Sequence, residues 1–235
     1  MNQNDITDKR TIKEFKGITF SKYKKSDAKK ELLNNLNNSK IEPSCYWAAE
    51  YICAGHYADL WEVLILFTSK YIHVGNPKLP IYLDLRIENF KQILNNGYRD
   101  NILKMRNNDK IRKLFGEIIC VLCLSKKKHT FDNIKVQKDD FNITKITYKM
   151  KAKSTQYAQR IYKKEDPTEL FIGINEFCWN ILKDQRNNSV ACYWLEWILG
   201  FEDIYKKEHK KYLASRRSNM PVDNSYQKDI IWIIW

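Results

Sequence analysis

Residues that make tight turns are scarce in this chain, which holds 7 glycines and 5 prolines among 235 residues. β-Sandwiches and barrels need many such turns, because their strands are joined through backbone angles that other residues rarely adopt. The scarcity disfavours those folds and favours helices joined by short polar links. The motifs GxxxxGK[ST], GxGxxG, GxSxG and HExxH are also missing. The sequence therefore carries no signature of nucleotide hydrolysis, dinucleotide redox chemistry or two large hydrolase classes.

Long apolar runs are missing as well. The longest, "VLILF" and "IIWIIW", fall far short of the ~20 residues that span a bilayer, and the first residues, "MNQNDITDKRTIKEF", lack the apolar core of a signal peptide. We therefore expect an intracellular protein without membrane insertion. Its six cysteines lie inside apolar runs, which is typical of reduced thiols and not of a disulfide scaffold.

Positive charge is abundant, because 41 Lys and Arg residues against 28 Asp and Glu residues give a formal net charge of +13. Such a field attracts polyanions, nucleic acid among them. An AT-rich genome would also enrich lysine and asparagine through codon supply, so this alternative stays open. Tyrosines such as Tyr23 interleave with the lysine clusters, as a phosphate-binding surface with stacking positions requires. The predicted nucleic-acid contacts are Lys22, Lys24, Lys25, Lys126, Lys127, Lys128, Lys206, Lys207, Lys210, Lys211, Arg216 and Arg217.

Apolar residues recur at helical spacing through most of the chain, with clear stripes beginning near Tyr57, Asp109 and Ser189. The pattern predicts an all-α protein, a helical bundle or stacked helical hairpins of about eight helices. One stretch near residues 125–165 lacks this period. Its β-branched patch, "FNITKITYKM", predicts an irregular or small β segment.

Composition shifts suggest four parts of the chain. Residues 1–25 have few apolar anchors, so we expect a basic mobile arm. Residues 26–124 form an N-terminal helical half, 125–165 an irregular connector and 166–235 a C-terminal helical half. One continuous domain is the alternative to two halves.

The triplet "CYW" occurs twice, at Cys45-Tyr46-Trp47 and at Cys192-Tyr193-Trp194. The similarity ends after these three residues, which is short for a duplicated module. Aromatic packing in the core is the preferred interpretation, because Trp and Tyr bring large buried areas. The helix around the first copy should be buried nearly all round, since Glu50 is the charged residue of its interior.

Few side chains suggest chemistry. Glu50 and Glu196 lie among aromatic residues, where burial would raise a carboxyl pKa towards the acid–base range, but pairing with Arg86 or Arg112 is the commoner arrangement. Cys120 and Cys123 have zinc-ligand spacing, yet no second CxxC or His pair completes a tetrahedral site. We therefore predict no catalytic site, no metal site and no cofactor.

Three segments, "CYWAAEYICAGHYADLWE", "HVGNPKLPIYL" and "RRSNMPVDNSYQKDIIWIIW", resemble parts of uncharacterised proteins of giant viruses of the nucleocytoplasmic large DNA class. The resemblance implies a viral origin and no known activity. Our hypothesis is a non-enzymatic viral accessory protein that contacts nucleic acid, located in the host cytoplasm, the viral factory or the virion. The alternative is a virion-assembly or interaction scaffold that docks a protein partner through its apolar end. That end comprises Ile230, Ile231, Trp232, Ile233, Ile234 and Trp235.

Overall fold

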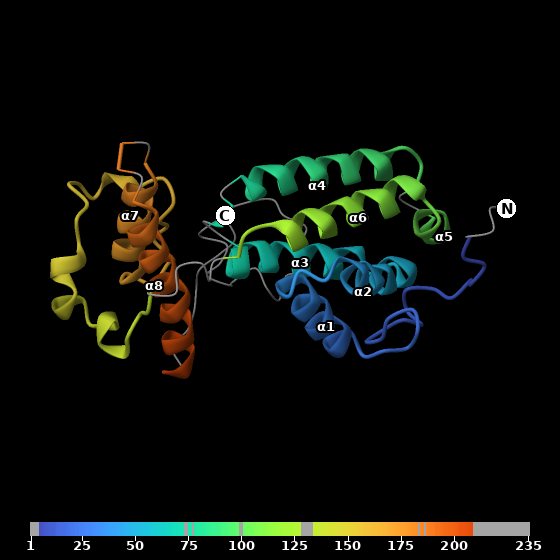
Figure 1. Cartoon of the computed structure of the whole chain (residues 1–235), viewed down its shortest axis with the longest axis horizontal. Coiled ribbons are helices and arrows are strands. Elements are labelled where there is room, and N and C mark those ends of the chain that lie inside the picture. Colours follow the sequence, from blue (N-terminus) through green and yellow to red (C-terminus); the bar gives the residue numbers. More distant parts are fainter. Residues whose placement is uncertain are drawn as a thin grey trace. The chain divides into compact units, whose positions relative to one another are not determined.

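A computed structural model of the chain describes residues 5–72, 75–76, 78–98, 101–127, 134–182, 184–185 and 187–208. These residues fall into two compact units that divide after Lys127, and each unit is described by itself. The first contains helices α1 to α6 and the second contains α7 and α8 (Figure 1).

The described residues are mainly helical and include no strand, which confirms the predicted all-α fold. Their one isolated β-bridge joins Ile18 to Lys24. A π-helix, η1 (Thr68–Ile72), continues α3. The eight α-helices are α1 (Lys25–Asn37), α2 (Ile41–Ala54), α3 (Tyr57–Phe67), α4 (Leu79–Asn95), α5 (Ile102–Arg106), α6 (Asp109–Leu124), α7 (Leu170–Ile181) and α8 (Asn188–Lys207).

The core of the first unit forms where α3 meets the apolar stripes of α4 and α6. Trp61 is fully buried there, with Phe90 and Phe115 at ring-centroid distances of 5.8 and 5.0 Å. Helix α6 also packs on α2, and α4 and α6 lie side by side (Figure 1). These contacts follow from helical periodicity, because each helix presents one continuous apolar face.

The N-terminal segment is not a mobile arm over its described part. Phe15 and Thr19 are fully buried, and the segment is attached to the link between α2 and α3. Nε2 of His56 lies 3.1 Å from the carbonyl oxygen of Phe15 and 2.9 Å from that of Ile18. These contacts correct our expectation for residues 5–24, because the anchoring side chain, His56, lies between α2 and α3, far along the sequence.

The second unit is built on α7 and α8, which pack closely against each other (Figure 1). Gly173 permits this approach, since a Cβ there would lie 2.7 Å from the Trp197 ring. Trp197 is fully buried, stacks on Phe141 at 5.5 Å and donates a 2.7 Å hydrogen bond to the carbonyl oxygen of Asp140. The irregular segment near 125–165 therefore supplies part of this core. Its 3-10 helices are η4 (Lys138–Phe141), η5 (Ile143–Lys145), η6 (Thr147–Lys149) and η7 (Gln156–Ala158).

Candidate nucleic-acid interface

Three of the predicted lysine contacts are engaged within the protein. Lys25 Nζ lies 2.9 Å from both carboxylate oxygens of Asp59, and Lys206 forms an ion pair with Glu202 one helical turn away. Lys127 Nζ donates hydrogen bonds of 2.7 to 3.0 Å to three carbonyl oxygens at the end of α6. The charges of these three lysines are thus partly satisfied before any phosphate approaches.

Lys127 has a structural role that its sequence position did not suggest. The last carbonyls of an α-helix lack partners within the helix and carry the negative end of its dipole, which an ammonium group stabilises. Burial lowers the pKa of Lys127, and its ammonium also lies 5.4 Å from the Phe67 ring centroid. We therefore remove Lys127 from the nucleic-acid surface and assign it to the C-terminal cap of α6.

Among the predicted lysines that form no such internal bond, Lys22, Lys24, Lys126 and Lys207 are exposed. Of these, Lys22 and Lys24 are two residues apart in one turn. The predicted clusters are divided between the two units, since Lys126 belongs to the first unit and Lys207 to the second. The predicted residues that lie outside the described part are Lys128, Lys210, Lys211, Arg216, Arg217, Ile230, Ile231, Trp232, Ile233, Ile234 and Trp235.

The turn over residues 19–24 is closed by its own backbone. The amide of Thr19 donates to the carbonyl oxygen of Tyr23 at 2.8 Å, and the amide of Lys22 donates to that of Thr19 at 3.0 Å. Lys22 adopts the left-handed backbone conformation, with φ of 67°. A residue other than glycine rarely occupies this region, and it does so where the surroundings determine the backbone.

In this protein, Glu50 of α2 holds the backbone of the turn in place. Its carboxylate accepts hydrogen bonds from the Thr19 hydroxyl at 2.7 Å, the Ser21 hydroxyl at 2.6 Å and the Ser21 amide at 2.8 Å. The side chain is 5% exposed, so these are charge-assisted bonds shielded from water. Our prediction that Arg86 or Arg112 pairs with Glu50 is wrong, because the turn's own donors satisfy the carboxylate. Glu50 positions the turn.

Two rings of α2 lie beside this turn. Trp47 makes edge-to-face contacts with Tyr23 at 5.1 Å and with Tyr46 at 5.2 Å between ring centroids. Tyr23 is 44% exposed and Tyr46 is 47% exposed. Hydrogen bonding with Tyr23 raises the pKa of Tyr46. We call this group the basic aromatic surface, and it consists of Lys22, Tyr23, Lys24, Tyr46 and Trp47.

The first CYW copy is therefore not core packing, contrary to our interpretation. The buried stripe of α2 runs through Ser44, Ala48 and Tyr51, and this phase turns Tyr46 and Trp47 outwards. Apolar content alone does not indicate that these two residues lie on the outer face of the helix. The signal that would have revealed them is the small-residue stripe, which marks the face of close helix packing.

The other side chains considered for chemistry do not form a second site. Glu196 is half-buried on α8, and Cys123 is buried with its thiol 3.6 Å from the Ser44 hydroxyl. Burial raises the pKa of the Cys123 thiol. Among the described residues, no three His, Cys, Asp or Glu side chains are placed to hold a metal ion. Within the same part of the chain, no helix has the length and apolar character needed to cross a bilayer.

No family model, no curated protein and no solved structure matches this chain. Conclusions about function therefore depend on its own residues.

Proposed function

We propose that this chain binds single-stranded nucleic acid through the basic aromatic surface, as a non-enzymatic accessory protein. The observation that carries the proposal is the pairing of exposed rings with two exposed lysines on a turn that a buried carboxylate holds in place. Unpaired bases stack on aromatic side chains, and neighbouring lysines neutralise the phosphates between them.

The availability of the lysines supports this proposal. Among the described residues, neither Lys22 nor Lys24 forms an ion pair or side-chain hydrogen bond, whereas the next lysine, Lys25, pairs with Asp59. Each free ammonium can displace a counterion from a phosphate, and counterion release supplies most of the sequence-independent affinity. Binding of a phosphate to these two lysines would therefore break no ion pair within the described part of the protein.

The rings favour a single strand over a duplex. The bases of a duplex stack on one another, so an exposed side chain reaches their edges and not their faces. Tyr23 and Tyr46 both contact Trp47 edge to face, and exposed rings of this kind offer their faces to unpaired bases. Stacking of this kind contributes about 1–3 kcal/mol per base and tolerates any sequence.

The test is fluorescence anisotropy of the full chain with a labelled mixed-sequence single strand, and with the same sequence as a duplex, over a series of salt concentrations. We expect tighter binding of the single strand. The double variant Lys22→Ala/Lys24→Ala should lower the salt slope by about 1.4, because each phosphate contact on a single strand contributes about 0.7. Tyr46→Ala should raise Kd roughly tenfold without a comparable change in slope.

The matched control is Lys163→Ala/Lys164→Ala, which removes the same charge from two exposed lysines of the second unit. If this control weakens binding as much as the Lys22/Lys24 pair, net charge explains the affinity and the proposal fails. Absence of binding at low salt also defeats it. The viral origin, and docking through residues 230–235, stay predictions.

A further inference from the structure

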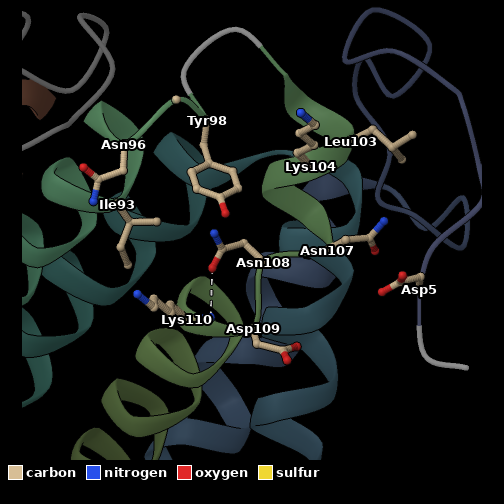
Figure 2. Close-up of a pocket in the computed structure, with 11 residues that line it drawn as sticks. Asp5, Ile93, Asn96, Tyr98, Leu103, Lys104, Asn107, Asn108, Asp109 and Lys110 are labelled. Carbon is tan, nitrogen blue, oxygen red and sulfur yellow. Dashed lines mark hydrogen bonds between the residues drawn. The ribbon is translucent and has the colours of Figure 1, made fainter. Parts of the chain in front are cut away.

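A polar cavity of about 860 Å³ lies beside the end of α4, α5 and the first turn of α6 (Figure 2). Two of its asparagines hold the chain itself together. Asn107 accepts a 2.8 Å hydrogen bond from the amide of Ile6 and donates one of 3.0 Å to the carbonyl oxygen of the same residue. Asn108 accepts from the amide of Lys110 at 2.9 Å and caps α6. These contacts are internal, so this cavity indicates no ligand.

A smaller cavity, of about 180 Å³, opens between the packed helices α2 and α6. A Cβ at Gly116 of α6 would meet no atom within 4 Å, so this glycine leaves the cavity open. Cys45 is half-buried and lines the cavity, which is large enough to admit a molecule the size of water or hydrogen peroxide. Its lining is mainly apolar and consists of Cys45, Ala48, Ala49, Ile52, Cys53, Arg112, Gly116 and Ile119.

The contacts between α2 and α6 fix how the two helices are aligned. The thiol of Cys123, near the end of α6, donates a 3.6 Å hydrogen bond to the hydroxyl of Ser44, near the start of α2. Cys53, near the end of α2, and Arg112, near the start of α6, line the same cavity. The two helices are therefore antiparallel, with the start of each beside the end of the other.

Three thiols meet at this helix pair. In the antiparallel arrangement, the residue after Ser44 and the residue one turn before Cys123 lie opposite each other, and both are cysteines, Cys45 and Cys120. Burial raises the pKa of the Cys45 thiol, and the nearby thiols of Cys120 and Cys123 raise it further. Cys45 and Cys120 are half-buried, whereas Cys123 is 1% exposed. The first two are therefore the accessible pair.

We propose that Cys45 and Cys120 form a reversible disulfide bond when the protein meets hydrogen peroxide. One thiolate attacks the peroxide and becomes a sulfenic acid, while the O–O bond breaks and one water leaves. The other thiolate attacks the sulfenic sulfur, the S–S bond forms and a second water leaves. Two thiols thus lose two protons and two electrons, and the peroxide is reduced to two waters.

The bond would join α2 to α6 and restrict the unfolded chain, so the oxidised protein should melt at a higher temperature. Because the Cys45 thiol has a raised pKa, little of it is thiolate at neutral pH, and the reaction should accelerate as the pH rises. The proposal does not depend on strand binding, because neither cysteine belongs to the basic aromatic surface.

The test is oxidation of the dilute full chain with hydrogen peroxide, followed by alkylation of the remaining thiols and mass spectrometry of unreduced peptides. We expect one linked peptide pair, containing Cys45 and Cys120, and the loss of two of the six free thiols. Formation should be faster at pH 9 than at pH 7. The melting temperature should rise by about 5–15 °C and return to its first value with dithiothreitol.

Cys45→Ala and Cys120→Ala should each abolish the cross-link and the rise in melting temperature. Cys53→Ala is the matched control, since Cys53 is a half-buried cysteine of the same helix that lines the same cavity, and this variant should keep the cross-link. If a variant fails to fold, the peptide map of the unaltered chain still decides. A different cysteine pair, a cross-link that survives in Cys45→Ala, a lower melting temperature after oxidation, or no cross-link at all would overturn the proposal.

Discussion

The two CYW triplets show how the same three residues serve opposite purposes. In α2, Tyr46 is 47% exposed and Trp47 is half-buried beside the 19–24 turn. In α8, Trp194 is fully buried against Trp197 at 5.9 Å. The difference lies in helix phase. The buried stripe of α8 passes through Ala191, Trp194 and Leu195, so its triplet faces the core, whereas the stripe of α2 passes on either side of its triplet.

The middle tyrosines differ in the same way. Tyr46 is edge-on to Trp47 at the surface, while the Tyr193 hydroxyl accepts a 3.0 Å hydrogen bond from Lys149. The ammonium of Lys149 also lies 4.3 Å from the Tyr193 ring centroid and pairs with Asp140 at 2.8 Å. A cation beside an aromatic ring is therefore internal structure in the second unit. In the first unit, under the proposed function, the lysines and aromatic rings of the basic aromatic surface bind a nucleic acid strand instead.

The largest expected effect is on the free energy of unfolding, and it distinguishes Trp194 from Trp47. Trp194→Ala should lower the free energy of unfolding by about 3–5 kcal/mol, because it leaves a large cavity in the core of the second unit. Trp47→Ala should lower it by no more than about 1 kcal/mol. Far-UV circular dichroism in a denaturant series measures both changes. Strand binding should respond in the opposite order, and equal losses of stability would refute the contrast drawn from helix phase.

A second contrast concerns two buried carboxylates that anchor irregular segments. Glu176 of α7 is 3% exposed and accepts from the amides of Lys151 and Ala152 at 3.0 to 3.1 Å, much as Glu50 accepts from the 19–24 turn. Glu50→Ala and Glu176→Ala should each lower the free energy of unfolding by about 2–3 kcal/mol, because buried donors lose their acceptor. Only Glu50→Ala should also weaken strand binding. Equal binding losses would show that the effect is general instability.

Acid should act on the Asp140 and Lys149 pair of the second unit. Burial alone would raise the pKa of Asp140, but its hydrogen bond with Lys149 lowers that pKa below the ordinary value. A carboxyl with a lower pKa in the folded state adds stability above its unfolded pKa and loses it as the pH falls, here from about pH 5 downwards. Asp140→Asn should therefore remove about 1–2 kcal/mol at neutral pH and flatten this acid dependence.

The neighbouring Asp139 is the control for Asp140. Its side chain is 81% exposed and lies 3.3 Å from Lys145. Asp139→Asn should change the free energy of unfolding by less than about 0.5 kcal/mol at any pH, since exposed ion pairs contribute little. Thermal unfolding at pH 7 and pH 4 compares the two variants. An acid dependence that survives in Asp140→Asn would place the titrating group elsewhere.

Helical periodicity was sufficient to predict where long helices lie. The stripes that begin near Tyr57 and Asp109 correspond to α3 and α6, because apolar residues recur at helical spacing over several consecutive turns. Helix starts were less predictable. Serine is a preferred N-cap residue, and Ser26 and Ser189 lie near the starts of α1 and α8, but the caps are Lys24 and Asn187. Tertiary contacts overrode the local capping preference in the first case, since the 19–24 turn leads directly into α1.

The candidate site was only partly predictable, for a different physical reason. Lys24 and Lys25 are alike in sequence, but Asp59, which lies 34 residues after Lys25, neutralises only the latter. The acceptor for the 19–24 turn, Glu50, is similarly remote, 31 residues after Thr19. Irregular segments have no hydrophobic periodicity in the sequence. Their polar groups pair with side chains of helices that are remote in the sequence, so the local residues do not indicate these partners.

The smallest effect concerns the backbone at Lys22 and separates the turn's conformation from its charge. A left-handed conformation disfavours residues with a Cβ, whereas glycine costs more entropy on folding, so Lys22→Gly should change the free energy of unfolding by less than about 0.5 kcal/mol. Ser39, at φ of 56° after α1, is the control, and Ser39→Gly should behave alike in stability. Only Lys22→Gly removes a cation, so only that variant should lower the salt slope of strand binding, by about 0.7. If Lys22→Gly kept the full slope, Lys22 would make no phosphate contact, and its strained backbone would need another explanation.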